Sequence, residues 1–234
     1  MKMKNRLLIV AALLVAVTTL IFSYAKARTQ GGQVVMVWGV IASNKQAPSS
    51  MADLLDWKAS NRVFEDLGAY VPGNVELRAD GKSEQVSRAS VSANFFSILG
   101  VKPQLGREFI AAEDQPGGAP VVILSYDVWQ NRLHASPAVI GRTITLNHEA
   151  YTVVGIMPKG FQFPSSTGVW TPLALEPRQL DRSTRLLNVL ARLKPGVSLD
   201  QAQADMNDIA RQLQQRYPDT NSGWGVNLSL LNVR

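Results

Sequence analysis

The sequence predicts an α+β fold in which strand–helix–strand units at both ends of residues 29–234 enclose an inserted β-rich subdomain. The first unit is indicated by a β-branched run over Val34–Trp38 followed by a capped helical pattern. The second consists of an apolar run over 188–193, an amphipathic stretch over 199–217 and an alternating run over 224–233. Between the units, short apolar runs separated by turn residues are typical of hairpins.

Composition excludes several classes of protein. The chain has 234 residues, of which 46% are hydrophobic, enough to bury a sizeable core. It contains no cysteine, which excludes disulfides, thiolate zinc sites, iron–sulfur ligation and a thiol nucleophile. The net charge of +6 includes Lys2, Lys4, Arg6 and Lys26, and without these four the chain carries only +2. Nucleic acid is therefore not an expected partner.

Residues 1–28 resemble a targeting segment. Nineteen uncharged residues lie between Arg6 and Lys26, a length between that of a signal-peptide core and that of a spanning helix. Ala25-Lys26-Ala27 has the small-x-small form of a cleavage site, whereas Lys26 and Arg28 are compatible with an anchor. Both interpretations, a signal peptide and a single membrane anchor, place residues 29–234 outside the cytoplasm.

The first unit contains a predicted buried strand over Val34–Trp38 and a helix that begins at Ser50. Ser50 with Asp53 three residues later resembles a capping box, and Met51, Leu54 and Trp57 share one face. The stretch from Asn61 to Gly68 is predicted to form a second short turn that Gly68 ends.

The middle of the chain is predicted to contain hairpins and short helices. Pro72-Gly73 and Asp80-Gly81 mark turns within 70–91, and Ser92 is expected to cap a short helix that Gly100 ends. The later expected elements are a strand over 121–124, a helix capped by Ser125, a hairpin over 143–154 with its turn at Asn147-His148, and a strand at Val169-Trp170.

The second unit carries the strongest local pattern. Ser198 and Gln201 form a capping box, and Pro218 prevents the helix from continuing. Its apolar residues recur every three or four positions along one face: Leu199, Ala202, Met206, Ile209, Leu213 and Tyr217.

No catalytic, cofactor-binding or metal-binding residue is predicted, and the chain is not expected to be an enzyme. It lacks a P-loop and a dinucleotide-binding glycine motif. Ser125 lacks the glycines of a nucleophile elbow and is interpreted as a helix cap. His134 and His148 lack the spacing of metal ligands and are assigned to a helix end and a hairpin turn.

The charged groups are interpreted as surface features. Four acidic residues are expected on the solvent-exposed face of a helix: Asp53, Asp56, Glu65 and Asp66. The stretch Asp219–Gly223 is expected to be a polar loop and not a calcium site. One basic series is interspersed with Glu176 and Asp181 and lacks a set of stacking aromatics, so it is not expected to bind nucleic acid: Arg178, Arg182, Arg185, Arg192 and Lys194.

Several stretches taken together resemble the MacB-like periplasmic core domain of ABC-transporter permeases, including the duplicated orphan permeases. The resemblance covers about residue 33 to the C-terminus and rests on the order and spacing of these stretches: Val34–Trp38, Asp53–Leu67, Val91–Val101, Leu105–Arg107, Val122–Tyr126 with Trp129, Val139–Ile144, Tyr151–Pro158, Ala191–Val197 and Tyr217–Asn221. A complete permease continues into further membrane helices, whereas no apolar stretch near 18 residues follows residue 25 here.

This resemblance implies a non-catalytic extracytoplasmic module that contacts partners and transmits motion driven by a cytoplasmic ATPase. It implies a porter-like part over about 33–92 plus 186–234, with an inserted subdomain over about 93–185. The implied partners are permease or ATPase subunits and, in some members, a periplasmic adaptor. The implied location is the bacterial inner membrane with the domain facing the periplasm, or the periplasm itself after cleavage.

Two alternatives remain beside this hypothesis. One is an autonomous secreted ligand-binding or adaptor protein with no pump partner. The other is an exported hydrolase, for which no constellation of residues is visible in the sequence.

Overall fold

The computed structural model describes residues 32–41, 46–79, 81–175 and 181–231, so the predicted N-terminal segment lies outside the described residues. Within those ranges, no helix combines the length and the apolar character needed to span a membrane. The elements are β1 Val34–Val40, β2 Gln46–Ala47, β3 Ser49–Ser50, α2 Met51–Ser60, β4 Phe64–Ala79, β5 Lys82–Val91, α3 Phe95–Leu99, β6 Leu105–Gly106, β7 Val121–Leu124, α4 Tyr126–Arg132, a 3-10 turn Pro137–Val139, β8 Thr143–Leu146, β9 Glu149–Ile156, β10 Val169–Pro172, β11 Arg185–Leu193, α5 Leu199–Arg216, α6 Pro218–Asn221 and β12 Gly225–Leu230.

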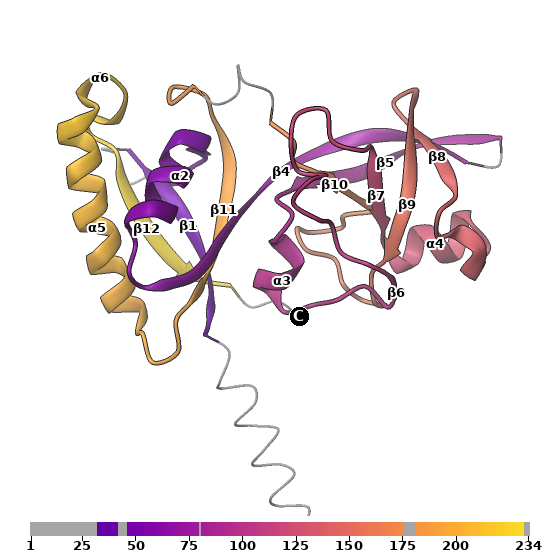
Figure 1. The fold of residues 1–234 in the computed structure, drawn as a ribbon, viewed down its shortest axis with the longest axis horizontal. Helices are drawn as coiled ribbons and strands as arrows, with labels where there is room; N and C mark the ends of the chain where they lie inside the picture. The colour runs from indigo at the N-terminus through magenta and orange to yellow at the C-terminus, as the bar shows by residue number, and fades with distance from the viewer. Residues whose placement is uncertain (1–31, 42–45, 80, 176–180, 232–234) are drawn as a thin grey trace, which may run out of the picture.

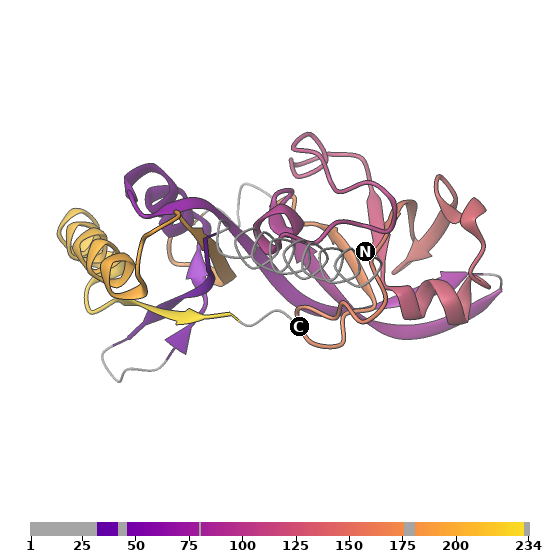
Figure 2. The ribbon, with the colours of Figure 1, turned by 90° about the horizontal axis from the view of Figure 1, so that it is seen from below.

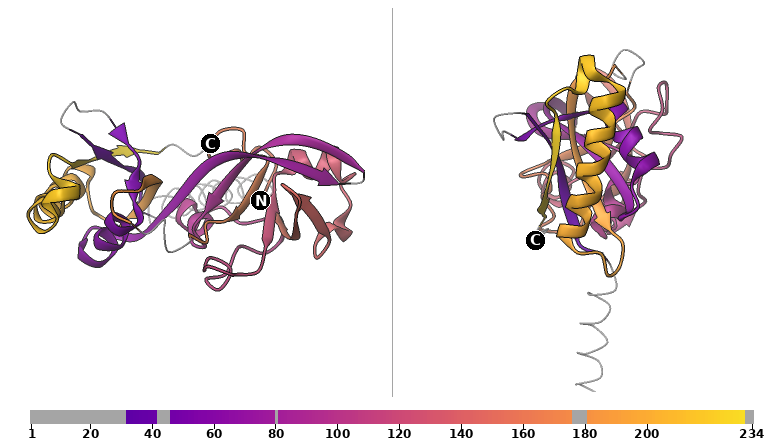
Figure 3. Two further views of the ribbon diagram at one scale, coloured as in Figure 1. Left: turned by 90° about the horizontal axis from the view of Figure 1, so that it is seen from above. Right: turned by 90° about the vertical axis from the view of Figure 1, so that its left-hand side faces the viewer.

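The two terminal strand–helix–strand units share one sheet, which confirms the predicted α+β class. The units are β1–α2–β4 and β11–α5–β12, and their strands lie in the order β12-β1-β11-β4. β1 is antiparallel to both neighbours, with Val35 opposite Ala191 on one side and Leu230 on the other. Figures 1 and 3 show α2 and α5 on the same face of this sheet. We call this sheet with α2, α5 and α6 the terminal subdomain, and the rest the central subdomain.

Apolar side chains from both helices and the sheet make the core of the terminal subdomain. Trp57 and Leu54 enter it from α2, and Met206, with no exposed surface, enters it from α5. The predicted capping box of α5 is confirmed, because the Gln201 N–H donates to the Ser198 hydroxyl while the Gln201 side chain accepts from the Ser198 N–H. These contacts fix where the long helix begins.

The other face of the terminal sheet packs against α3 in the central subdomain. Met36 and Leu190 share a core with Phe95 and Phe96 of this helix. Gly100 ends α3 at φ 71°, as predicted, because glycine adopts this left-handed conformation without steric cost.

The cap assigned to Ser92 is wrong. The N-cap position of α3 is occupied by Asn94, whose side chain makes no capping hydrogen bond, and the Ser92 hydroxyl instead accepts the backbone N–H of Ala69 in β4. The serine is therefore used to join α3 to the sheet.

The expected turns at 61–68 and at Pro72-Gly73 are also wrong, because both stretches lie at or within the 16-residue strand β4. β11 pairs with β4 from Phe64 to Tyr70, and β5 pairs with it from Tyr70 onward. Pro72 is tolerated because the pairing between β11 and β4 ends at Tyr70. No β11 residue lies opposite Pro72, so the missing proline N–H removes no hydrogen bond between the strands. The predicted turn before β5 is confirmed at Gly81, whose φ is 76°, while Asp80 lies outside the described residues.

The central subdomain carries the predicted hairpin and capped helix. β8 and β9 pair across Asn147 and His148, both of which have positive φ, as a type I′ two-residue turn requires. The Ser125 hydroxyl accepts the N–H of Val128 and caps α4, as predicted. Figure 2 shows the two subdomains side by side along the long axis of the molecule. The predicted division at about residues 92 and 186 stays a prediction, and β4 runs through both subdomains.

Side-chain amides cover two unpaired strand edges in the described part of the chain. On β12, the Gln203 amide donates to the Val226 carbonyl and accepts the Leu228 N–H. On β4, Asn147 accepts the Glu76 N–H with its side chain and donates its own N–H to the Glu76 carbonyl. Covered edges of this kind resist pairing with other chains.

We expect Gln203→Ala to lower the free energy of unfolding by about 1–2 kcal/mol, because it leaves the Val226 carbonyl and the Leu228 N–H without partners. Urea unfolding measures this change, and sedimentation velocity should show that the variant self-associates more strongly. Asn207→Ala is the control, since it removes only the contact between the Gln203 and Asn207 side chains. Equal effects of the two substitutions would contradict the assigned role of Gln203.

Candidate functional site

The joint between the two subdomains is the candidate functional site. Two stretches of chain connect the subdomains. One is β4, and the other is the stretch from β10 to the first residue of β11, residues 173–185, which we call the returning segment. Leu173 and Leu175 of this returning segment pack into the terminal core. The Asp114 carboxylate accepts the N–H groups of Ala174 and Ala93, at 2.8 and 2.9 Å, and so ties the segment to the start of α3.

A buried ionic cluster fixes the far end of the returning segment. Asp53 on α2 is 1% exposed, and its Oδ1 accepts Arg182 Nη1 and Asn221 Nδ2, each at 2.8 Å. Its Oδ2 accepts Arg185 Nη1 at 2.5 Å. Arg182 Nη2 reaches Asp56 at 2.6 Å. We call these five residues the Asp53 cluster; two carboxylates balance two guanidinium groups in it.

Aromatic rings complete the surroundings of both arginines. The Arg182 guanidinium lies 3.7 Å from the centroid of the Tyr217 ring, and that of Arg185 lies 3.7 Å from the Trp224 ring. Burial acts to lower the pKa of Arg182, but hydrogen bonds and charge from Asp56 and Asp53 outweigh it and raise the pKa. The arginine is therefore held in its charged form. The cluster joins α2, α6 and the start of β11, and the Tyr217 ring at the end of α5 packs against it.

The expectation that Asp53 lies on the solvent-exposed face of a helix is wrong. Its position in the first turn of α2 faces the returning segment, whose arginines lie about 130 positions later in the chain. Asp56 is half-buried, while Glu65 and Asp66 lie exposed on β4 instead of a helix. Sequence periodicity found the helix but carried no signal for an ion pair formed across this separation.

Members of the basic series have distinct partners. Arg182 and Arg185 belong to the Asp53 cluster, and Arg192 donates to the carbonyls of Gly32 and Ile98. Lys194 donates to the carbonyl of Arg62, and Arg178 lies outside the described residues. The series is thus used mainly to hold chain segments together.

The remaining candidates have simple structural positions. His148 lies in the β8–β9 turn and His134 just after α4, as assigned from the sequence. Among the described residues, no group of three or more metal-ligating side chains occurs. The expected polar loop at Asp219–Gly223 is partly wrong, because Pro218–Asn221 form the short helix α6.

An Arg107–Glu113 pair closes the loop before β7. Arg107 donates two hydrogen bonds to the Glu113 carboxylate, at 2.6 and 3.0 Å, and the Ile110 N–H donates a third at 2.9 Å. Burial acts to raise the pKa of Glu113, but these hydrogen bonds and the charge of Arg107 lower it overall. The loop holds Phe109 in the core and leaves Ile110 exposed.

Because the pKa of Glu113 is lowered on folding, its stabilising effect is present above the ordinary glutamate value near 4.3 and is lost as the pH falls through the folded value. Glu113→Gln is therefore expected to lower the urea midpoint at pH 7 and to have a shrinking effect below about pH 4. Urea unfolding at pH 7, 5, 4 and 3 measures this. A difference between the two proteins that grows on acidification would contradict it.

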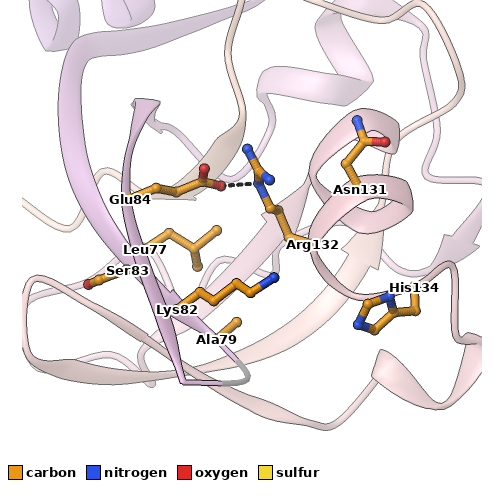
Figure 4. A pocket seen from close by; sticks show the side chains of 8 residues that line it. All are labelled: Leu77, Ala79, Lys82, Ser83, Glu84, Asn131, Arg132 and His134. Carbon is orange, nitrogen blue, oxygen red and sulfur yellow. Dashed lines mark ion pairs between the residues drawn. The ribbon is translucent and has the colours of Figure 1, made fainter.

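A groove of about 410 Å³ lies at the outer end of the central subdomain, between the β4–β5 hairpin and the end of α4. Figure 4 shows side chains from both elements directed toward this space. The Glu84 carboxylate forms an ion pair with Arg132 across it, and Leu77 and Ala79 contribute apolar surface. The ammonium group of Lys82 has no partner among the described residues.

Comparison with known proteins identifies the family. The sequence profile of the MacB-like periplasmic core domain matches residues 8–209, which is most of the chain. The chain belongs to this family. No curated protein matches it.

Solved MacB-like domains share the fold. The periplasmic region of MacB from Actinobacillus actinomycetemcomitans is 13% identical, with a TM-score of 0.64 and coverage of 87% of this chain and 91% of that one. The extracellular domain of the noncanonic ABC-type transporter YknZ from Gram-positive bacteria is 14% identical, with a TM-score of 0.63 and coverage of 83% and 99%. These results confirm the family and the α+β fold predicted from the sequence.

Proposed function

We propose that this MacB-like domain is a non-catalytic module that works outside the cytoplasm in an ABC-transporter permease system. In this role it contacts permease subunits and a periplasmic adaptor, and it transmits motion that a cytoplasmic ATPase drives. The observation that carries the proposal is the position of the chain ends. The Leu231 N–H donates to the Val34 carbonyl, so the two ends of the described chain lie side by side, at the lower edge of the terminal subdomain in Figure 1.

The opposite end of the terminal subdomain is held by the Asp53 cluster, beside α6 at the top of Figure 1. A displacement applied at the chain ends would reach β1 and β12 first, and β11 and β4 through the shared sheet. β4 would then carry it into the central subdomain. Two connections, a continuous strand and an anchored return, suit a module that moves as one body.

The proposal places the domain on the periplasmic side of the bacterial inner membrane, or in the periplasm if residues 1–28 are cleaved. We expect alkaline phosphatase fused after Arg234 to be active in cells, because this enzyme requires export. An inactive fusion of normal abundance would contradict the location while leaving the fold untouched.

Partner contact can be tested by photocrosslinking in cells that carry the full chain. A photoreactive amino acid replaces Ile110, which is 52% exposed on the closed loop before β7. We expect adducts with a permease subunit or an adaptor, identified by mass spectrometry. Adducts only with unrelated proteins at both Ile110 and a second exposed site, Leu55, would overturn the proposal.

A further inference from the structure

β5 has an open edge along its first half. β10 pairs with β5 only from Arg88 onward, and the Gly168 N–H donates to the Ser87 carbonyl on that side. Backbone groups alternate in direction along a strand, so the N–H and C=O groups of Gln85 and Ser83 point the same way as those of Ser87. In the described part of the chain, no hydrogen bond reaches these groups of Ser83 and Gln85 on that side.

The opposite strand supports this assignment independently. Glu76 lies directly across from Gln85, and both of its backbone groups bond Asn147 on the far side of β4. Glu76 and Gln85 therefore form a non-hydrogen-bonded pair, in which both residues direct their backbone groups outward. The pairing of β4 with β5 therefore requires that the backbone N–H and C=O of Gln85 point away from β4, toward the open edge.

Space for another strand lies beside this edge. The groove of about 410 Å³ and a second hollow of about 360 Å³ both contact Glu84, Asn131 and Arg132. Residues 82–87 of β5 form one wall of these two hollows, and residues of α4 form the opposite wall. Figure 4 shows the helix standing away from the strand here, joined to it by the Arg132–Glu84 ion pair.

This edge differs from two others in the same molecule. The β12 edge is covered by Gln203 and the β4 edge by Asn147, whereas no side chain in the described residues covers Ser83 and Gln85. An uncovered edge is a ready template for strand addition. The charges also favour one kind of occupant. Glu84 is neutralised by Arg132, whereas Lys82 has no charged partner within the described ranges, and His134 also lines the groove.

We propose that Ser83–Ser87 of β5 is a strand-addition site for an extended segment of a partner protein with an acidic side chain at the Lys82 end. The segment continues the line of β10 along the sheet and lies between β5 and α4. Its backbone bonds Ser83 and Gln85, and its carboxylate meets the Lys82 ammonium. The site rests on the geometry of the edge and holds whether or not the partner belongs to a transporter.

The test uses the purified full chain and a fluorescent nine-residue peptide of alternating valine and threonine with two glutamates at one end. Fluorescence anisotropy should show saturable binding. A peptide of the same sequence with every backbone amide methylated should not bind, because neither of its edges can then donate an N–H to β5 or approach it closely. Hydrogen exchange should show protection of the Ser83 and Gln85 amides by the first peptide only.

Two variants of one residue separate the backbone from the side chain. Gln85→Pro removes an N–H that faces the groove and leaves the β4 ladder intact, so the affinity should fall by about tenfold, the effect of one hydrogen bond. Gln85→Ala keeps that N–H and should bind within about twofold of the unsubstituted chain.

A third variant tests the charge at the Lys82 end. Lys82→Gln should weaken binding of the glutamate peptide by about threefold, as expected for an exposed ion pair, and should not change binding of a peptide with glutamines in place of the glutamates.

Absence of peptide binding, equal binding of the methylated peptide, or protection elsewhere in the chain would overturn the proposal. If Gln85→Pro fails to fold, the methylated peptide still decides the question on the unsubstituted chain. Self-association that buries this edge and excludes the peptide would assign the site to a second copy and also overturn the proposal.

Discussion

Asp53→Ala is expected to lower the free energy of unfolding by about 3–5 kcal/mol, because it leaves two largely buried guanidinium groups without their shared carboxylate. The side chains of Arg182 and Arg185 are only 15% and 12% exposed, so water cannot fully replace the lost partner. Asp56 still contacts Arg182, but Arg185 loses its only carboxylate in the described structure. The effect should therefore be far larger than that of a surface ion pair.

Urea unfolding of the full chain measures this prediction. Asp208→Ala is the matched control, since Asp208 pairs with Arg211 on the exposed surface of α5 and such pairs contribute about 0–1 kcal/mol. Similar losses for the two alanine variants would show that the Asp53 cluster does not anchor the returning segment.

Met206→Asp is expected to remove most of the stability of the domain. Met206 has no exposed surface and packs in the core between α5 and the terminal sheet. Loss of its burial costs about 2–5 kcal/mol, and an unpaired buried carboxylate adds to this. A total above about 5 kcal/mol approaches the whole stability of an ordinary domain.

Thermal unfolding followed by circular dichroism tests this substitution. Asn207→Asp introduces the same group one residue later, on the exposed face of α5, and should change stability by at most about 0.5 kcal/mol. If Met206→Asp melts like the unsubstituted chain, α5 does not pack on the terminal sheet in solution.

Local sequence patterns were sufficient to predict the elements whose cause is local. The capping box at Ser198, the positive φ at Gly100 and the hairpin at Asn147-His148 each depend on residues a few positions apart. The meeting of the two terminal units was also predictable, because each has one apolar face that neither can bury alone.

Features formed by distant residues escaped prediction. The turn expected at Pro72-Gly73 follows the usual preferences of these residues, but pairing with β5 along ten positions overrides them. Asp53 resembles an ordinary first-turn acid until the fold brings Arg182 and Arg185 beside it. The open edge of β5 has no sequence signal, because it depends on where β10 begins to pair.

The most direct test of the proposed coupling is whether the two subdomains move as one body. The chain has no cysteine, so Ala204→Cys on α5 and Ile140→Cys in the central subdomain can be spin-labelled uniquely. Pulsed electron paramagnetic resonance should give one narrow distance distribution, which broadens when Asp53→Asn releases the returning segment in a chain that remains folded. A broad or two-peaked distribution in the otherwise unsubstituted chain, or one that Asp53→Asn leaves unchanged, would contradict the account.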